Sequence, residues 1–145
     1  MNMYVKQISV FIENTPGRLA DFTRLLGDHQ IDLISLSIAD TTTFGILRGI
    51  VKDYDRAVDV INQAGYTACL TDVLTIEVPD VPGALAKVLG ILSEDGVSIE
   101  YLYSFLRDGG KEAFIILRTE QIDKAYETLK HNHVRLLSQE EVCAL

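Results

Sequence analysis

The sequence has few of the features that mark secreted or membrane proteins. It has only two cysteines, Cys69 and Cys143, and they form no CxxC pair. We therefore expect free, mostly buried thiols in a reducing compartment. No apolar run approaches the roughly 18 residues that a membrane-spanning helix needs, and the N-terminus does not resemble a signal peptide. These absences favour a cytoplasmic protein with no membrane partner.

Basic side chains are also scarce. The chain has 13 lysines and arginines against 21 acidic residues, a formal net charge of −8, and no basic run. Because affinity for nucleic acid depends on clustered Lys and Arg, we expect no nucleic-acid partner. Only three prolines and ten glycines accompany a 48% hydrophobic composition, which is typical of a globular protein and not of a disordered or fibrous one.

Catalytic signatures are missing as well. No glycine-rich phosphate loop occurs, and no serine lies in a glycine-flanked elbow. The acidic pairs Glu94–Asp95 and Glu140–Glu141 fall at expected helix ends, where charge is usually solvated. His131 and His133 form an H-x-H without the other ligands of a zinc site. We therefore expect no enzyme activity, no cofactor and no metal.

The chain does contain an internal repeat. Residues 11–26, FIENTPGRLADFTRLL, are echoed by residues 76–92, IEVPDVPGALAKVLGIL. At this offset of 66, the aligned pairs include Pro16 with Pro82, Gly17 with Gly83, and Leu19 with Leu85. The sequence therefore predicts two copies of one unit, residues 1–70 and residues 71–145, with almost no linker between them.

Each copy shows the same order of strand and helix patterns. Alternating apolar residues predict strands, and apolar residues at a spacing of 3.6 predict helices. The first helix is expected to begin at Pro16 with Thr15 as its N-cap, and its buried face to include Leu19. Ser138 and Glu141 fit a capping box for a last helical turn. The strands are expected at residues 5–12, 31–39, 44–51 and 66–71, then in the second copy at 97–106, 112–118 and 133–137 after a first strand near 72–78.

This order is β-α-β-β-α-β in both copies. It predicts an α+β fold of two tandem ferredoxin-like modules, each an antiparallel sheet with its helices on one face. Hairpin turns are expected at residues 40–43 and 107–110. Edge strands left open in such a pair favour a homodimer.

The repeated Pro-Gly turn has two interpretations. In the first, it is ordinary capping chemistry between a strand and a helix. In the second, the free N–H groups of the helix start bind a carboxylate, and Gly17 and Gly83 let a ligand approach the main chain. Asn14, Asp80 and Asp32 would then accept hydrogen bonds from an ammonium group. The second interpretation predicts a site for a free amino acid or similar small zwitterion.

The motif [N/D]-x-P-G-x-L, together with "QIDL" and "GVSI" before the second strands, resembles the ACT domain, a family of regulatory modules that bind amino acids. The resemblance covers both copies and implies a regulatory, allosteric function. It also implies that ligands lie at interfaces between modules, against the first strand–helix loop and the start of the second strand. By position, the implied ligand-binding residues are Asn14, Thr15, Pro16, Gly17, Arg18, Leu19 and Asp32 in the first copy, and Asp80, Val81, Pro82, Gly83, Ala84, Leu85 and Ser98 in the second.

Two alternatives remain beside the sensor hypothesis. Tyr101, Tyr103 and Phe105 alternate along one strand and could form core, a dimer contact, a ligand wall or the surface of a protein-interaction module. Arg18 and Asn14 share the first loop, as a small acylphosphatase-like hydrolase would need. If the protein is a sensor, its regulated output lies in a partner, for which a separate metabolic enzyme is the candidate.

Overall fold

The computed structural model describes residues 3–40, 43–107 and 110–145. The chain divides into two compact units, and each contains one copy of the repeat. We call Lys6–Thr71 the first module, and Asp72–Leu145 with the N-terminal residues through Val5 the second module. The N-terminal residues therefore pack with the copy that is remote from them in sequence.

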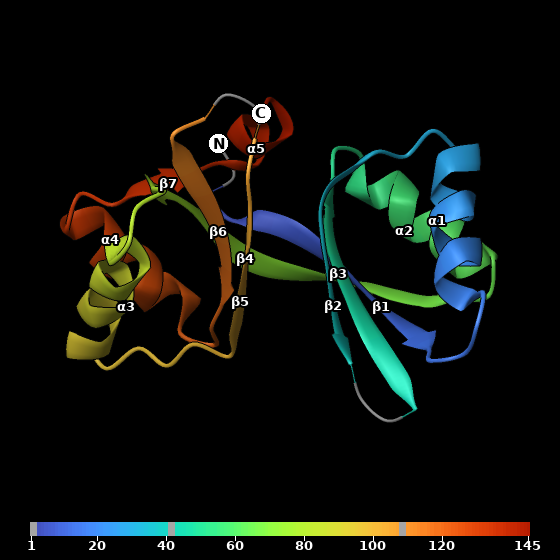
Figure 1. Ribbon diagram of the computed structural model, residues 1–145, viewed down its shortest axis with the longest axis horizontal. Coiled ribbons are helices and arrows are strands. Elements are labelled where there is room, and N and C mark those ends of the chain that lie inside the picture. Colours follow the sequence, from blue (N-terminus) through green and yellow to red (C-terminus); the bar gives the residue numbers. More distant parts are fainter. Residues whose placement is uncertain (1–2, 41–42, 108–109) are drawn as a thin grey trace. The chain divides into compact units, whose positions relative to one another are not determined.

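The first module has the strand order β2-β3-β1-β4, and β3 runs antiparallel to both β1 and β2. Its two helices lie on one face of this sheet (Figure 1). Its elements are β1 (Val5–Glu13), α1 (Arg18–Asp28), β2 (Leu33–Asp40), β3 (Phe44–Val51), α2 (Tyr54–Gln63) and the beginning of β4 (Thr67–Pro79).

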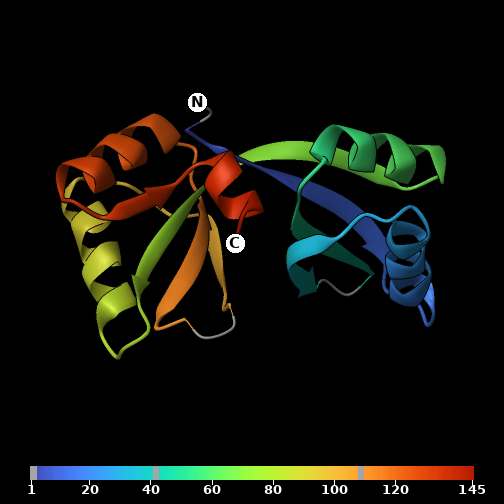
Figure 2. The same cartoon turned by 90° about the horizontal axis from the view of Figure 1, so that it is seen from above.

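The second module repeats this plan with the strand order β7-β4-β6-β5, and each neighbouring pair is antiparallel. Its helices α3 and α4 lie together on one face of the sheet (Figures 1 and 2). The α+β prediction of two ferredoxin-like modules is therefore confirmed. The elements that follow β4 are α3 (Ala84–Glu94), β5 (Tyr101–Phe105), β6 (Glu112–Arg118), α4 (Ile122–His131), β7 (Arg135–Leu137) and α5 (Gln139–Cys143).

Strand β4 belongs to both copies. The sequence suggested two strands, and the structure has one strand of 13 residues from Thr67 to Pro79. No glycine or proline interrupts the segment before Pro79, so nothing in it favours a turn. Its first residues complete the first module, and the remainder is the first strand of the second.

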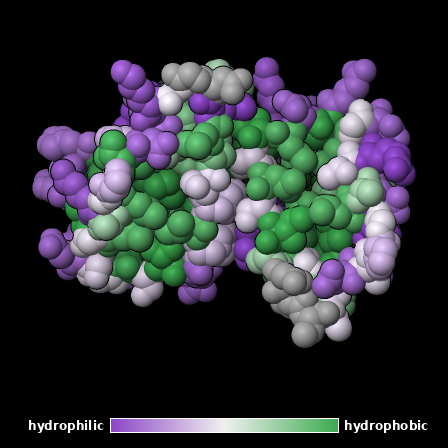
Figure 3. All heavy atoms as spheres, viewed as in Figure 1, coloured by the Kyte–Doolittle hydropathy of each residue, from purple (hydrophilic) through white to green (hydrophobic). Residues whose placement is uncertain are grey.

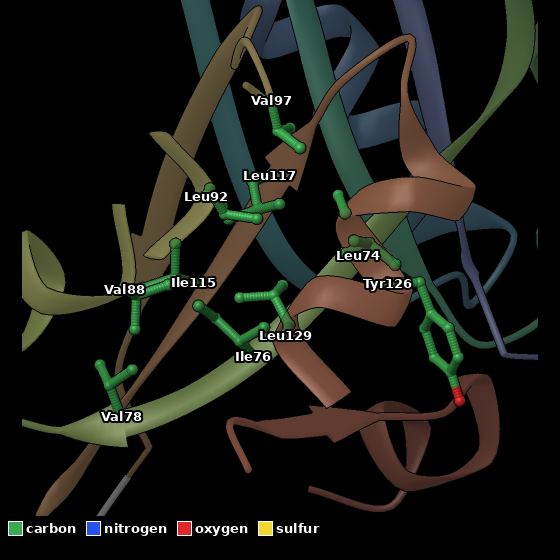
Figure 4. Close-up of a cluster of buried hydrophobic side chains, with 11 residues drawn as sticks. Leu74, Ile76, Val78, Val88, Leu92, Val97, Ile115, Leu117, Tyr126 and Leu129 are labelled. Carbon is green, nitrogen blue, oxygen red and sulfur yellow. The ribbon is translucent and has the colours of Figure 1, made fainter. Parts of the chain in front are cut away.

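Each module has its own hydrophobic core between sheet and helices. In the first, the alternate β1 residues Ile8 and Val10 are fully buried beneath Phe22 and Leu26 of α1. In the second, Figure 4 shows Leu92 of α3 close to Leu117 of β6. The period of two in the strands and 3.6 in the helices thus predicted these buried residues correctly, with Leu19 as an exception.

The start of the first helix differs from the prediction. Helix α1 begins at Arg18, and its N-cap is Gly17 with no side-chain cap bond, so Thr15 does not cap it and Pro16 lies outside it. Leu19, expected on the buried face, is 40% exposed. Helix α3 begins in the same way after its N-cap Gly83. Each helix starts late because the Pro-Gly residues before it form a separate turn.

The last helix was predicted correctly. In the capping box of α5, the Glu141 amide donates to Ser138 Oγ at 3.2 Å, and the Ser138 amide donates to Glu141 Oε1 at 3.1 Å. The prediction of mostly buried cysteines was wrong for Cys69, which is exposed, while Cys143 is partly exposed. The expected hairpin turns include residues 41–42 and 108–109, which lie outside the described residues.

Candidate ligand pockets at the repeated turn

The Pro-Gly turn has the same conformation in both modules. In the first, the Arg18 amide donates to the Thr15 carbonyl at 3.3 Å, and Gly17 has φ 88° and ψ −17°. These values are those of a type II β-turn, which places proline second and requires a residue with positive φ third. In the second module, the Ala84 amide donates to the Val81 carbonyl at 3.3 Å. The motif therefore has a structural reason in addition to any contact with a ligand.

Further backbone bonds attach each turn to its sheet in equivalent ways. The Asn14 amide donates to the Thr43 carbonyl at 3.1 Å, and the Asp80 amide donates to the Lys111 carbonyl at 2.9 Å. The polar residue of the motif is thereby fixed beside the start of the third strand in each module. Its side chain, whether amide or carboxylate, is presented at one end of the sheet.

The helices that follow offer free backbone donors. The first intrahelical bonds run from the Asp21 amide to the Gly17 carbonyl at 2.9 Å and from the Lys87 amide to the Gly83 carbonyl at 3.0 Å. Of the amides between these residues, those of Arg18 and Ala84 donate within the turns, and the next two in each helix have no carbonyl four residues earlier that could accept from them within the helix. Because no side chain caps either helix start, these donors and the positive end of each helix dipole are available to an anion.

A pocket lies against the turn in the first module. It has a volume of about 160 Å³ and an apolar floor that includes Ile12 and Ile38. Asn14 and Thr15 come from the turn, and Leu19 comes from the first helical turn. We call this cavity the first pocket. Its complete lining is Ile12, Glu13, Asn14, Thr15, Leu19, Ile38 and Gly45.

The second module has a pocket in the equivalent place, which we call the second pocket. Its volume is about 200 Å³. Several lining residues differ from those of the first pocket; on the strands, Ser104 stands where the first module has Ile38, and Ala113 stands where it has Gly45. Its complete lining is Val78, Pro79, Asp80, Val81, Ala84, Leu85, Leu102, Ser104, Ala113 and Ile115.

Most of the residues expected from the sequence lie at these two places. The pocket linings include Asn14, Thr15, Leu19, Asp80, Val81, Ala84 and Leu85. The turns themselves are formed by Pro16, Gly17, Pro82 and Gly83.

Arg18 lies elsewhere. Its guanidinium is 4.8 Å from the ring centroid of Tyr66, and the same ring packs edge-on against Phe22 at 5.2 Å. Arg18 Nε is buried and has no hydrogen-bond partner among the described residues. Arg18 does not line the first pocket, so the structure does not join it with Asn14 into the anion site of a hydrolase.

Asp32 is also remote from the turn of its own module. It precedes Leu33, which pairs with Val51, whereas Glu13 before the turn pairs with Phe44. These two places are separated by most of the length of β3, about 24 Å at ~3.4 Å per residue.

Ser98 has the same remote position in the second module. Its backbone groups are already bonded within the module: the Ser98 amide donates to Gln121 Oε1 at 3.0 Å, and the Ser98 carbonyl accepts from Thr119 Oγ1 at 2.7 Å. Neither module brings its second-strand residue together with its turn.

The residues that sequence reasoning missed come from neighbouring strands. They include Ile38 and Gly45 in the first pocket, and Leu102, Ser104 and Ala113 in the second. The pairing register of the strands could have identified them: Ile12 pairs with Gly45, which places Gly45 beside the end of β1.

The aromatic stripe lies on the face of β5 opposite the second pocket. Leu102 and Ser104 line the pocket, and alternate residues point to the other side of the sheet. Tyr101, Tyr103 and Phe105 are half-buried there, and Phe105 stacks on Phe114 with ring centroids 5.3 Å apart. The stripe is therefore not a wall of this pocket.

Two further findings concern the described part of the chain. It contains no group of three or more His, Cys, Asp or Glu side chains that could hold a metal ion. None of its helices is both long enough and apolar enough to cross a membrane.

The chain is similar to known proteins in both sequence and fold. The sequence model of a family described as "ACT domain pair" matches residues 3–145. A crystal structure of protein BT0572 from Bacteroides thetaiotaomicron is 45% identical, and the match covers 99% of this chain and 98% of that one with a TM-score of 0.92. The regulatory subunit of aspartate kinase from Thermus thermophilus, in its ligand-free form, shares the fold at 18% identity, with a TM-score of 0.65 over 88% of this chain and 92% of that one.

One curated relative matches over a shorter stretch. The protein MJ1458 of Methanocaldococcus jannaschii is 44% identical over 57 residues, which are 39% of this chain and 26% of that protein. The match therefore spans about a quarter of the relative's length.

Proposed function

The chain belongs to the family of paired ACT domains, and on that premise we propose that it is a non-catalytic regulatory protein that binds a free amino acid or a similar small zwitterion. One observation supports the proposal above the others: both copies keep the same turn, the same anchoring bonds and a pocket in the same place. The pocket is present in both modules although many of the side chains around it differ, so the packing of particular side chains does not explain it. A retained cavity beside retained donors is typical of a binding site.

The pockets suit the two charged groups of an amino acid. The proposed carboxylate position is at the first-turn amides of α1 or α3, where the helix dipole favours an anion. The proposed ammonium position is at the Asn14 side-chain oxygen in the first pocket and at the Asp80 carboxylate in the second. Because a charged acceptor gives the stronger hydrogen bond, we expect the second pocket to bind a zwitterion more tightly.

The size of the pockets limits the ligand. Volumes of about 160 and 200 Å³ are below the range of roughly 300–1,000 Å³ found for drug-sized ligands. Apolar floors beside the polar groups favour a small amino acid over a sugar or a nucleotide. In the first pocket the floor is narrowed by Ile38, whereas Ser104 leaves more room in the second.

Regulation would act through assembly. A ligand that fits one arrangement of the protein better than another shifts the population toward it, without chemistry. We propose that this shift is transmitted to a separate metabolic enzyme, and that the protein acts as a homodimer in the cytoplasm. Figure 3 shows hydrophobic side chains gathered over β2 and β3, and β2 ends the strand order of the first module.

The test is a thermal-unfolding screen against the proteinogenic amino acids at millimolar concentration. A ligand at 100 times its Kd should raise the free energy of unfolding by about 2.7 kcal/mol. In the second pocket, Asp80→Ala should weaken binding about tenfold or more, because a hydrogen bond to a charged group contributes ~1.5–3 kcal/mol. Ser104→Ile should weaken binding there by narrowing the pocket with the side chain that the first module carries at that position.

Gly90→Ala is the matched control, since an added Cβ at this exposed α3 position meets nothing within 4 Å. It should leave the ligand-induced shift unchanged. The proposal is wrong if no amino acid moves the unfolding transition, or if Asp80→Ala and Ser104→Ile leave every ligand-induced shift intact.

A further inference from the structure

A larger cavity lies on the other side of the Pro82–Gly83 turn, between α3 and β7. We call it the α3–β7 pocket. Its volume is about 480 Å³, more than twice that of either pocket described above and within the range typical of small-molecule sites. Ala84, Val88 and Ile91 of α3 form one wall, and Val134 lies opposite.

In the part of the first module that the structure describes, larger side chains occupy the equivalent space. The repeat aligns Ala84 with Arg18, Val88 with Phe22, and Val134 with Tyr66. In the first module these three larger side chains pack on one another, with Arg18 over the Tyr66 ring and Phe22 edge-on to it. The second module carries a small side chain at all three positions, and a cavity results.

The charges at this pocket favour an anion. Arg135 is neutralised by Glu77 at 2.7 Å and by Glu141 at 2.9 Å. Lys87 also lines the pocket and forms no ion pair with any residue that the structure describes. The first module has Asp21 at the equivalent position, so the copy that gained the cavity also carries a cation beside it.

We propose that the α3–β7 pocket binds a small organic anion with an apolar body, such as a carboxylate with an aromatic or branched aliphatic group. The carboxylate would lie at Lys87 near the start of α3, and the apolar body would pack against Val88, Ile91 and Val134. This site goes beyond the proposed amino-acid pockets, since it lies on the other side of the turn and its lining carboxylate, Glu77, is already paired with Arg135.

The test uses 3-phenylpropanoate as the probe and its neutral isostere 3-phenylpropanamide as the comparison, in titrations of the ¹⁵N-labelled full chain followed by NMR. We expect the acid to shift the amide signals of residues 83–91 and 134, with a Kd at least fivefold lower than that of the amide. Lys87→Met, which keeps the aliphatic stem, should raise the Kd of the acid at least fivefold. Lys52→Met is the matched control, because it removes one exposed lysine from the first module and should change the Kd less than twofold.

The double substitution Ala84→Arg and Val134→Tyr introduces the residues with which the first module occupies the space, and it should abolish binding of both probes. The proposal is overturned if the acid and the amide bind alike, if Lys87→Met changes the Kd less than fivefold, or if the double variant, once shown to be folded, still binds. Ser104→Ile should not affect these titrations. A failed amino-acid screen would therefore refute the proposed function and leave this result standing.

Discussion

At the scale of single residues, the glycines of the repeated turn have a conformational reason that can be measured. Gly17 and Gly83 have φ of +88° and +90°, and a Cβ added at either would meet nothing within 4 Å. Substitution by alanine should therefore cost backbone energy without a steric clash. We expect Gly17→Ala and Gly83→Ala each to lower the free energy of unfolding by about 1–2 kcal/mol in urea denaturation.

Gly90→Ala provides the opposite control, because Gly90 lies inside α3 with ordinary helical geometry and open space around it. Alanine there should raise stability by roughly 0.5–1 kcal/mol. If Gly83→Ala left the free energy of unfolding as high as Gly90→Ala does, the positive φ would not explain why both copies have glycine in the turn.

Part of the candidate site could be predicted from the sequence, and the reason is local. Asn14, Thr15 and Leu19 are contiguous with the turn, so a motif that specifies the turn also specifies their place. Ile38 and Gly45 could not be found in this way, because they reach the pocket through strand pairing. Arg18 was misplaced for a related reason, since its partner Tyr66 comes from the other end of the module.

At the scale of secondary-structure elements, periodicity predicted nearly every strand and helix. Strands β3 and β6 begin and end where the sequence indicated, at Phe44–Val51 and Glu112–Arg118. Strand β5 is shorter than expected, and β4 is one strand in place of two. Strand β4 is continuous because nothing before Pro79 favours a turn, and β5 extends only over the residues that pair with β6.

The N-terminal segment before β1 shows how an element far away in sequence is recruited by contacts. The Tyr4 hydroxyl donates to Asp123 Oδ1 of α4, and the Tyr4 ring packs edge-on against Tyr126 with centroids 6.0 Å apart. The hydrogen bond to the Asp123 carboxylate, together with burial and that negative charge, raises the pKa of Tyr4 to about 12 from its ordinary value of 10.0. The neutral phenol is therefore stabilised by folding.

This raised pKa predicts a pH dependence with a definite sign. Because the folded protein holds the Tyr4 proton more tightly than the unfolded chain, the contribution of Tyr4 to stability is complete below pH 10 and is lost as the pH rises toward 12. Tyr4→Phe should lower the free energy of unfolding at pH 7 by about 1 kcal/mol. The difference between wild type and variant should shrink between pH 10 and 12 in urea titrations, and a constant difference would contradict this interpretation.

At the scale of the whole molecule, the two modules have diverged around a common plan. The first module uses large side chains, Arg18 and Tyr66, where the second uses Ala84 and Val134. The exposed edges differ in their side chains, since β2 ends one strand order and its counterpart β5 ends the other, with Ser104 where β2 has Ile38. A duplicated chain of this kind can use one copy for ligand binding and the other for assembly.

The first module offers the more hydrophobic edge. Leu36 and Ile38 of β2 are 42% and 45% exposed, and an open edge strand with apolar side chains favours pairing with a second copy of the chain. We therefore expect the wild-type protein to sediment at twice the mass of one chain. Leu36→Lys should convert it to a monomer at micromolar concentration, because a charge on an edge strand opposes pairing. Leu106→Lys, which places the same charge just after β5, should leave the dimer intact, and the reverse result would move the interface to the second module.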